Sequence, residues 1–176
     1  MGRVASRCDD MAEMAEAFCR LVDAIDPRGE ERAWWLQMRE LLPRLHMAVI
    51  ALGESDAPCK TYSLPDDEQR FELYIQLNHR LQANALLGQK LGENPLFSRL
   101  CERLADDLTD MYFDLRRGLE LLQRHPAQPQ LATVDWQSSF YQHWGHHLLD
   151  AERWLYAVDS AERAPATRPW VAMSLI

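Results

Sequence analysis

The stretch LCERLADDLTDMYFDLRRGLELL, residues 100–122, carries the clearest structural signal in this 176-residue chain. Its leucines and its methionine recur at steps of three and four residues, which places them along one side of an α-helix. Charged residues fill many of the other positions, so the helix has one buried and one solvated face. Leu and Ala also far outnumber the β-branched Val and Ile in the whole chain, and this bias favours helix over sheet.

Similar apolar stripes mark four further segments. Together with the stretch above, which follows Asn94-Pro95, they predict helices over residues 9–25, 29–52, 65–88 and 96–124, and a fifth helix that follows Thr133 to Asp135 and reaches residue 158. Pro43 lies inside the second helix, where it predicts a kink or a break. The other prolines fall between the segments and separate them. Because short connections favour antiparallel neighbours, the sequence predicts an all-α fold, an up-and-down bundle of about five helices.

The length suits a single domain with one core. No internal repeat or domain boundary interrupts the stripes, so residues 1–163 are predicted to form one bundle. Residues 164–176 form a tail that contains prolines and ends in apolar side chains. We expect the tail either to fold back onto the bundle or to offer a hydrophobic peptide to a protein partner or a second copy of the chain.

Charge and missing signals narrow the class of protein. The formal net charge of −8 argues against a nucleic-acid surface, which needs clustered Lys and Arg. No apolar run approaches the roughly 20 residues of a membrane span, and the charged N-terminus lacks the core of a signal peptide. The four cysteines form no CxxC pair, which fits reduced thiols in the cytoplasm. No GxxxxGK[ST], GxGxxG, HExxH or GxSxG string indicates an enzyme.

Polar residues at the edges of the apolar faces mark one candidate site. Asp107, Asp110 and Asp114 follow i, i+3, i+7 spacing and share one flank of their helix. On the last predicted helix His147 falls inside the apolar arc and His143 lies one turn earlier, so both could ligate one ion. Bundles build metal sites from carboxylates and imidazoles that project inward from facing helices, which makes a divalent metal one interpretation. The Glu-x-x-His pairs of di-iron bundles are absent.

A second interpretation of the same residues is structural, and the sequence favours it. His147 would hydrogen-bond one aspartate and fix the register of two helices, since a buried imidazole needs a partner. The other aspartates would pair with nearby arginines, Arg103, Arg116 or Arg117. Such pairs contribute only about 0.3–0.5 kcal/mol when exposed, and they require no cofactor.

Two short strings resemble a known family. DMYFDL at residues 110–115 and WG at residues 144–145 resemble a bacterial helical family, domain-of-unknown-function family 5063, in which an Asp-x-Tyr-x-Asp-Leu helix precedes a Trp-Gly helix. LLPRL at residues 41–45 is similar to that family's Leu-Pro segment, and the order matches along most of the chain. The resemblance implies an all-helical fold and no particular activity. The resemblance draws attention to Asp110, Tyr112, Asp114 and Trp144. Together with His147, they are the candidate ligand-binding residues.

Two glycines on the predicted helices indicate close packing. Gly118 falls inside an apolar arc, so another helix or a large ring is expected to approach it. Gly145 costs up to about 1 kcal/mol relative to Ala within a helix, and close packing would explain its presence.

Two hypotheses of function follow. The first is a non-enzymatic cytoplasmic bundle that acts through protein contacts or as a small-ligand module, because the core stripes are complete and no catalytic unit is recognisable. The second is a metal- or ligand-binding bundle, a hydrolase in one version, that uses Asp and His residues of the last two helices. Under the first hypothesis, which we favour, the protein is not an enzyme.

Overall fold

The computed structural model of this protein describes residues 2–25, 31–53, 67–83 and 95–163. These ranges are almost entirely helical and contain no strand, so the all-α prediction is confirmed. In chain order the elements are α1 (Gly2–Asp23), α2 (Glu31–Ala51), α3 (Asp67–Gln82), α5 (Pro95–Arg124), α6 (Gln130–Ser139), the π-helical turn η1 (Phe140–Trp144) and α7 (Gly145–Arg163).

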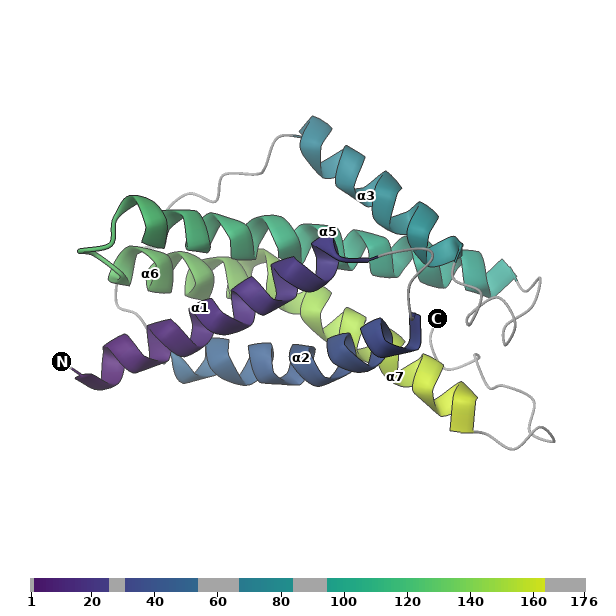
Figure 1. Cartoon of the computed structure of the whole chain (residues 1–176), viewed down its shortest axis with the longest axis horizontal. Coiled ribbons are helices and arrows are strands. Elements are labelled where there is room, and N and C mark those ends of the chain that lie inside the picture. The colour runs from purple at the N-terminus through teal and green to yellow at the C-terminus, as the bar shows by residue number, and fades with distance from the viewer. Residues whose placement is uncertain (1, 26–30, 54–66, 84–94, 164–176) are drawn as a thin grey trace.

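Helix α5 lies at the centre of the bundle (Figure 1). It packs against α1, α3, α6 and α7, while α2 packs against α1 and α7. The elements α6, η1 and α7 follow one another without a break and form one long helical path beside α5. Counted as one helix, this path completes the bundle of about five helices that the sequence predicts.

The predicted apolar stripes of α1, α2, α5 and the α6–α7 path form the core. Its largest fully buried side chains include Met11, Phe18, Met38, Leu104, Trp136 and Trp144. Helix α3 contributes less to this core. Its Leu77 and Leu81 are buried, but Phe71, which the stripe predicts to face the core, is 61% exposed.

Several predicted helix limits need correction. Helix α1 begins at Gly2 rather than near Asp9, and α6 begins at Gln130 rather than near Thr133. The sequence predicts a kink or a break at Pro43, and helix α2 continues through it without a break. Pro43 has no N–H to donate to the carbonyl four residues earlier in the helix. Because Pro43 is exposed, water can hydrogen-bond to that carbonyl instead.

Gly118 on α5 has the close neighbour that the sequence predicts. The indole of Trp136 on α6 covers it, and a Cβ added to Gly118 would lie 2.0 Å from Nε1 of Trp136. The same indole N–H donates to the carbonyl of Leu115 at 3.1 Å. A glycine therefore lets α6 approach α5 closely enough for an indole to hydrogen-bond the helix backbone.

Gly145 is explained by the π-helical turn before it. The backbone N–H of Gly145 donates to the carbonyl of Phe140, five residues earlier, and a Cβ on Gly145 would lie 2.5 Å from that oxygen. The sequence predicts close packing at this glycine but not the π turn. Such turns widen a helix locally and are frequent at functional sites.

Some predictions fall outside the described residues. These include most of the loop at residues 53–63, the end of the third predicted helix, and the tail at residues 164–176. The division into a bundle of residues 1–163 and a tail therefore stays a prediction.

Candidate metal centre

The three aspartates of the candidate site lie on one side of α5, facing the α6–α7 path. Asp107, Asp110 and Asp114 are all buried, as their position on the edge of the apolar stripe allows. Across from them, His147 near the start of α7 is also buried, and His143 in η1 is half-buried. The structure thus brings together all five residues that the sequence analysis grouped as candidate metal ligands.

His147 lies between two carboxylates of α5. Its Nδ1 is hydrogen-bonded to Oδ1 of Asp107 at 2.9 Å. Its Nε2 lies 3.1 Å from Oδ2 of Asp110. Both nitrogens of this imidazole therefore face carboxylate oxygens. Through these contacts the ring connects the beginning of α7 to the middle of α5.

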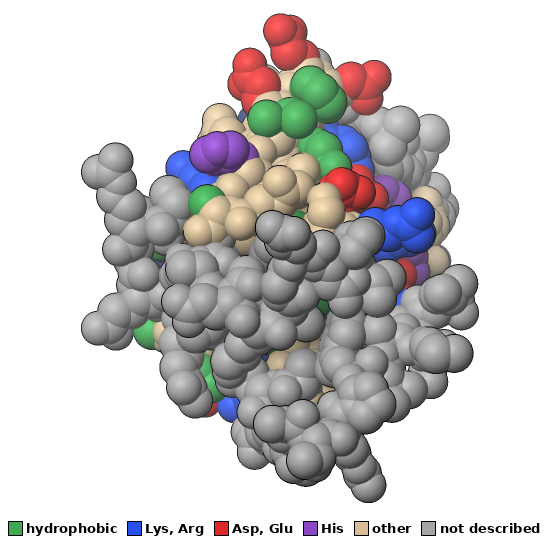
Figure 2. All heavy atoms as spheres, turned by 90° about the vertical axis from the view of Figure 1, so that its right-hand side faces the viewer, with side chains coloured by type: hydrophobic (Ala, Val, Ile, Leu, Met, Phe, Trp, Pro, Cys, Tyr) green, Lys and Arg blue, Asp and Glu red, His purple; other side chains and the backbone are tan. Residues whose placement is uncertain are grey.

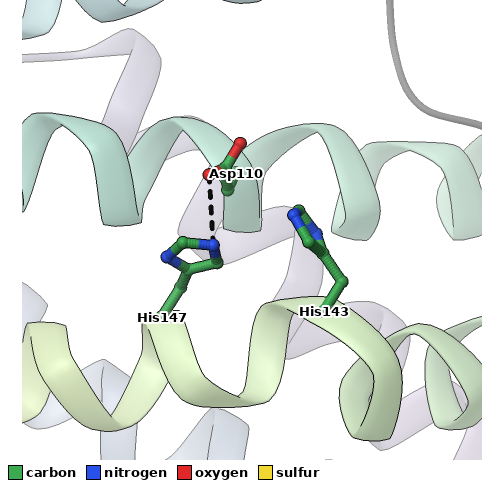
Figure 3. Close-up of side chains that lie close together, drawn as sticks. All are labelled: Asp110, His143 and His147. Carbon is green, nitrogen blue, oxygen red and sulfur yellow. Dashed lines mark ion pairs between the residues drawn. The ribbon is translucent and has the colours of Figure 1, made fainter.

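His143 is held in a similar way one turn earlier. Its Nδ1 lies 2.7 Å from Oδ2 of Asp114, and its ring centroid is 5.1 Å from that of His147. Figure 3 shows both rings extending from the η1–α7 helix toward Asp110 on α5. Asp110, His143 and His147 each offer one ligand atom, and these atoms all lie within 4.8 Å of one another.

Two arginines border the aspartates. Arg70 of α3 donates from Nε to Oδ1 of Asp110 at 2.5 Å and from Nη2 to Oδ2 at 2.7 Å, and the same Nη2 contacts Asp106 at 2.8 Å. Arg117 donates to Asp114 at 2.7 Å and to Asp135 at 3.0 Å. The pairing of Asp114 with Arg117 matches the structural interpretation.

The arginine that binds Asp110 is not among the three that the sequence predicts as partners of the aspartates. Arg103 and Arg116 were the other arginines expected to pair with the aspartates, but Asp110 pairs with Arg70, which comes from a different helix. Arg116 instead donates to the hydroxyl of Tyr112. Helical phase predicts which arginines share a side with an aspartate on the same helix, and it gives no information about a side chain 40 residues away.

Negative charge is in excess around these residues. Among the described residues, the ion pairs of this group involve the guanidinium groups of Arg70 and Arg117 and the carboxylates of Asp106, Asp107, Asp110, Asp114 and Asp135. Burial raises the pKa of Asp107, although the hydrogen bond from His147 opposes this. Burial lowers the pKa of His147, but the hydrogen bond to Asp107 and the charge of Asp110 outweigh it, so the net pKa is raised.

One carboxylate oxygen of this group has no hydrogen-bond partner within the part of the chain that the structure describes. This is the buried Oδ2 of Asp107, whereas Oδ1 of the same carboxylate is hydrogen-bonded to His147. A buried acceptor without a donor costs about 1–3 kcal/mol. The described contacts alone therefore leave this group of residues incompletely satisfied.

Two residues of the proposed ligand-binding set lie elsewhere. The hydroxyl of Tyr112 donates to Asp23 of α1 at 3.1 Å, away from the histidines. Trp144 is fully buried, and its indole N–H donates to Oγ of Ser139 at 3.1 Å, as expected for a core side chain. Of that set, Asp110, Asp114 and His147 lie together, and Tyr112 and Trp144 have structural contacts.

The structure defines the chain as an all-helical bundle with a buried group of aspartates and histidines between two long helices. A family model described as a domain of unknown function (DUF5063) matches residues 4–161, and the chain belongs to this family. No curated protein and no solved structure matches it. Among the described residues, no helix has both the length and the apolar character needed to cross a bilayer.

Proposed function

We propose that this protein binds a divalent transition-metal ion between α5 and the η1–α7 helix, with Asp110, His143 and His147 as ligands. One observation carries the proposal: two imidazoles, each with its Nδ1 against a separate carboxylate, extend toward a third carboxylate. Ion pairing alone would need only one carboxylate for each ring.

The spacing of the ligand atoms fits a metal ion with small adjustments. Tetrahedral zinc with bonds of about 2.0–2.1 Å to nitrogen and oxygen holds its ligand atoms about 3.4 Å apart. Nε2 of His147 and Oδ2 of Asp110 are 3.1 Å apart, and no pair in the set exceeds 4.8 Å. Shifts of about 1 Å, within the reach of side-chain rotation, would bring all three atoms onto one ion.

The surrounding carboxylates are placed as supporting groups for such an ion. A histidine that binds metal through one nitrogen commonly donates its other N–H to a carboxylate, which fixes the tautomer and the ring orientation. Asp107 is the carboxylate in this position for His147, and Asp114 is the one for His143. The excess of carboxylates also supplies the negative charge that a divalent cation needs.

The ligand types indicate the class of metal. Two imidazoles and one carboxylate suit Zn²⁺, Fe²⁺ or another first-row transition metal, whereas Mg²⁺ and Ca²⁺ prefer oxygen ligands. Asp110 and His147 are only 5% and 8% exposed, so the site favours retention of an ion over access for a substrate. We therefore propose a binding role rather than hydrolysis.

Zinc calorimetry tests the proposal. The chain is stripped with a chelator and titrated with Zn²⁺, and we expect one ion per chain. A double change, His143→Gln with His147→Gln, should abolish binding, while His125→Gln at an exposed position serves as the matched control. Circular dichroism checks that each variant is folded. Absence of Zn²⁺ binding, or equal binding by the folded double variant, would show that the residues form only a structural network.

The other hypothesis, action through a protein partner or as a homo-oligomer, stays a prediction. The tail at residues 164–176, one surface that a partner could bind, lies outside the described residues.

A further inference from the structure

Helix α3 is the least deeply embedded of the described helices. Residues 67–76, its first ten, include no buried side chain, and both Phe71 and Ile75 are exposed. Figure 2 shows acidic and hydrophobic side chains exposed side by side at the top of the molecule, where α3 lies in Figure 1. The buried residues of α3, Leu77 and Leu81, belong to its second half.

Arg70 links the first half of α3 to α5 through three hydrogen bonds. Its guanidinium donates to both oxygens of Asp110 and also to Asp106, which lies one turn earlier on α5. A bidentate guanidinium–carboxylate pair fixes direction as well as distance. The beginning of α3 is thus attached to α5 through the carboxylate that the proposed metal would use.

We infer that Arg70 and a metal ion at Asp110 oppose each other, so that metal binding weakens the attachment of the first half of α3 to α5. This inference rests on the proposed function. The ion would bind Oδ2 of Asp110, the oxygen that faces His147 and also accepts from Nη2 of Arg70. A divalent charge next to that oxygen repels the guanidinium and withdraws electron density from its acceptor.

The two effects must be reciprocal. If the ion weakens the contact of Arg70 with Asp110, then that contact lowers the affinity for the ion by the same factor. Once displaced, the guanidinium still has Asp106 as a partner, because this carboxylate is half exposed and outside the proposed ligand set. The start of α3 is therefore the part of the described fold that responds to the metal.

Two variants of α3 test the inference by calorimetry with Zn²⁺. Arg70→Gln removes the opposing charge and should bind Zn²⁺ about tenfold more tightly than the unchanged chain, within the usual range of coupling between sites. Arg80→Gln, on the second half of the same helix, is the matched control. It should change the affinity for Zn²⁺ less than about twofold, as expected for a residue that is not coupled to the metal site. Equal or weaker binding by folded Arg70→Gln would overturn the inference and leave the proposed function intact.

Hydrogen exchange tests the same inference without a variant. On addition of Zn²⁺, amides of residues 67–76 should exchange faster, while those of α5 around Asp110 should exchange more slowly. Unchanged or slower exchange over residues 67–76 in a chain that binds Zn²⁺ would contradict the inference. If the unchanged chain binds no Zn²⁺ at all, the proposed function fails and the inference fails with it.

Discussion

The indole of Trp136 occupies the space that a side chain at Gly118 would need. Because a Cβ at this position would lie 2.0 Å from Nε1 of Trp136, Gly118→Ala must push α6 away from α5 or tilt the indole. Overpacking of this kind costs about 1–3 kcal/mol, and the better helix propensity of Ala returns about 0.5–1 kcal/mol. We expect a net loss of up to about 2.5 kcal/mol in the free energy of unfolding, measured by urea denaturation.

A double-mutant cycle separates the clash from other effects of this substitution. In a Trp136→Phe background the smaller ring leaves room for a methyl group, so Gly118→Ala should cost clearly less there. An identical cost in both backgrounds would mean that the indole does not set the requirement for glycine.

Gly145→Ala should disturb both the fold and the candidate metal centre. Its Cβ would lie 2.5 Å from the carbonyl oxygen of Phe140, so the π-helical turn must open or shift. We expect a loss of stability of about 1–3 kcal/mol and a lower Zn²⁺ affinity, because His143 belongs to this turn. Denaturation and calorimetry measure the two effects.

Tyr141→Ala is the control for the turn, since Tyr141 lies in it but is 74% exposed. This change should leave Zn²⁺ affinity unaltered. If Gly145→Ala lowers stability and spares Zn²⁺ affinity, the π turn does not position the ligands.

The helices and the grouping of the site were predictable because both depend on local periodicity. An apolar stripe and the flank beside it follow from the helical angle per residue, so Asp107, Asp110 and Asp114 could be placed on one side of α5. The same angle per residue places His143 and His147 on or beside the apolar side of the last predicted helix. Because consecutive long helices commonly pack against each other, the aspartates and the histidines could be predicted to face one another.

The π-helical turn left a signal that was not recognised. Ala132, Trp136, Phe140, Trp144 and Leu148 are all buried and follow one another at steps of four residues. In a regular helix each such step drifts by roughly 40° around the axis, so the series would leave the core. A wider turn within the series corrects this drift. An unbroken run of apolar residues every four positions can therefore indicate a π turn.

The role of Arg70 was not predictable from periodicity. Helix α3 precedes α5 in the chain and packs against it, but α3 carries more than one arginine. Which of them reaches Asp110 depends on how α3 packs on α5, and the single-chain pattern does not contain that information. Tyr112 and Trp144, to which the family resemblance draws attention, make hydrogen bonds to Asp23 and Ser139 that the motif strings do not indicate.

Two cysteines are expected to be unreactive in the folded protein. Burial raises the pKa of both Cys19 and Cys101 to about 12, so at pH 8 almost none of either thiol is in the reactive thiolate form. Iodoacetamide at pH 8, followed by peptide mass spectrometry, should label these residues only after denaturation. Labelling of native Cys101 at the rate of a free thiol would show that α5 opens locally at its start.

The final prediction concerns stability and pH in the chelator-treated protein. The pKa of His147 is raised in the folded chain, so its protonated form is favoured by folding relative to the unfolded value of about 6.5. The stability that protonated His147 contributes is fully present at pH values below the pKa of the unfolded chain. It is lost as the pH rises through the higher pKa that His147 has in the folded chain. The difference in unfolding free energy between the unchanged chain and His147→Gln should therefore shrink as the pH rises from about 6 to 9.

Urea denaturation across this pH range measures the difference. His146→Gln is the control, because its ring centroid is 3.9 Å from that of His147 but its side chain is exposed. The control should show no comparable trend, since it leaves the contacts of His147 with Asp107 and Asp110 in place. A difference for His147→Gln that stays constant or grows with pH would mean that folding does not favour protonated His147, and that Asp107 holds a neutral ring instead.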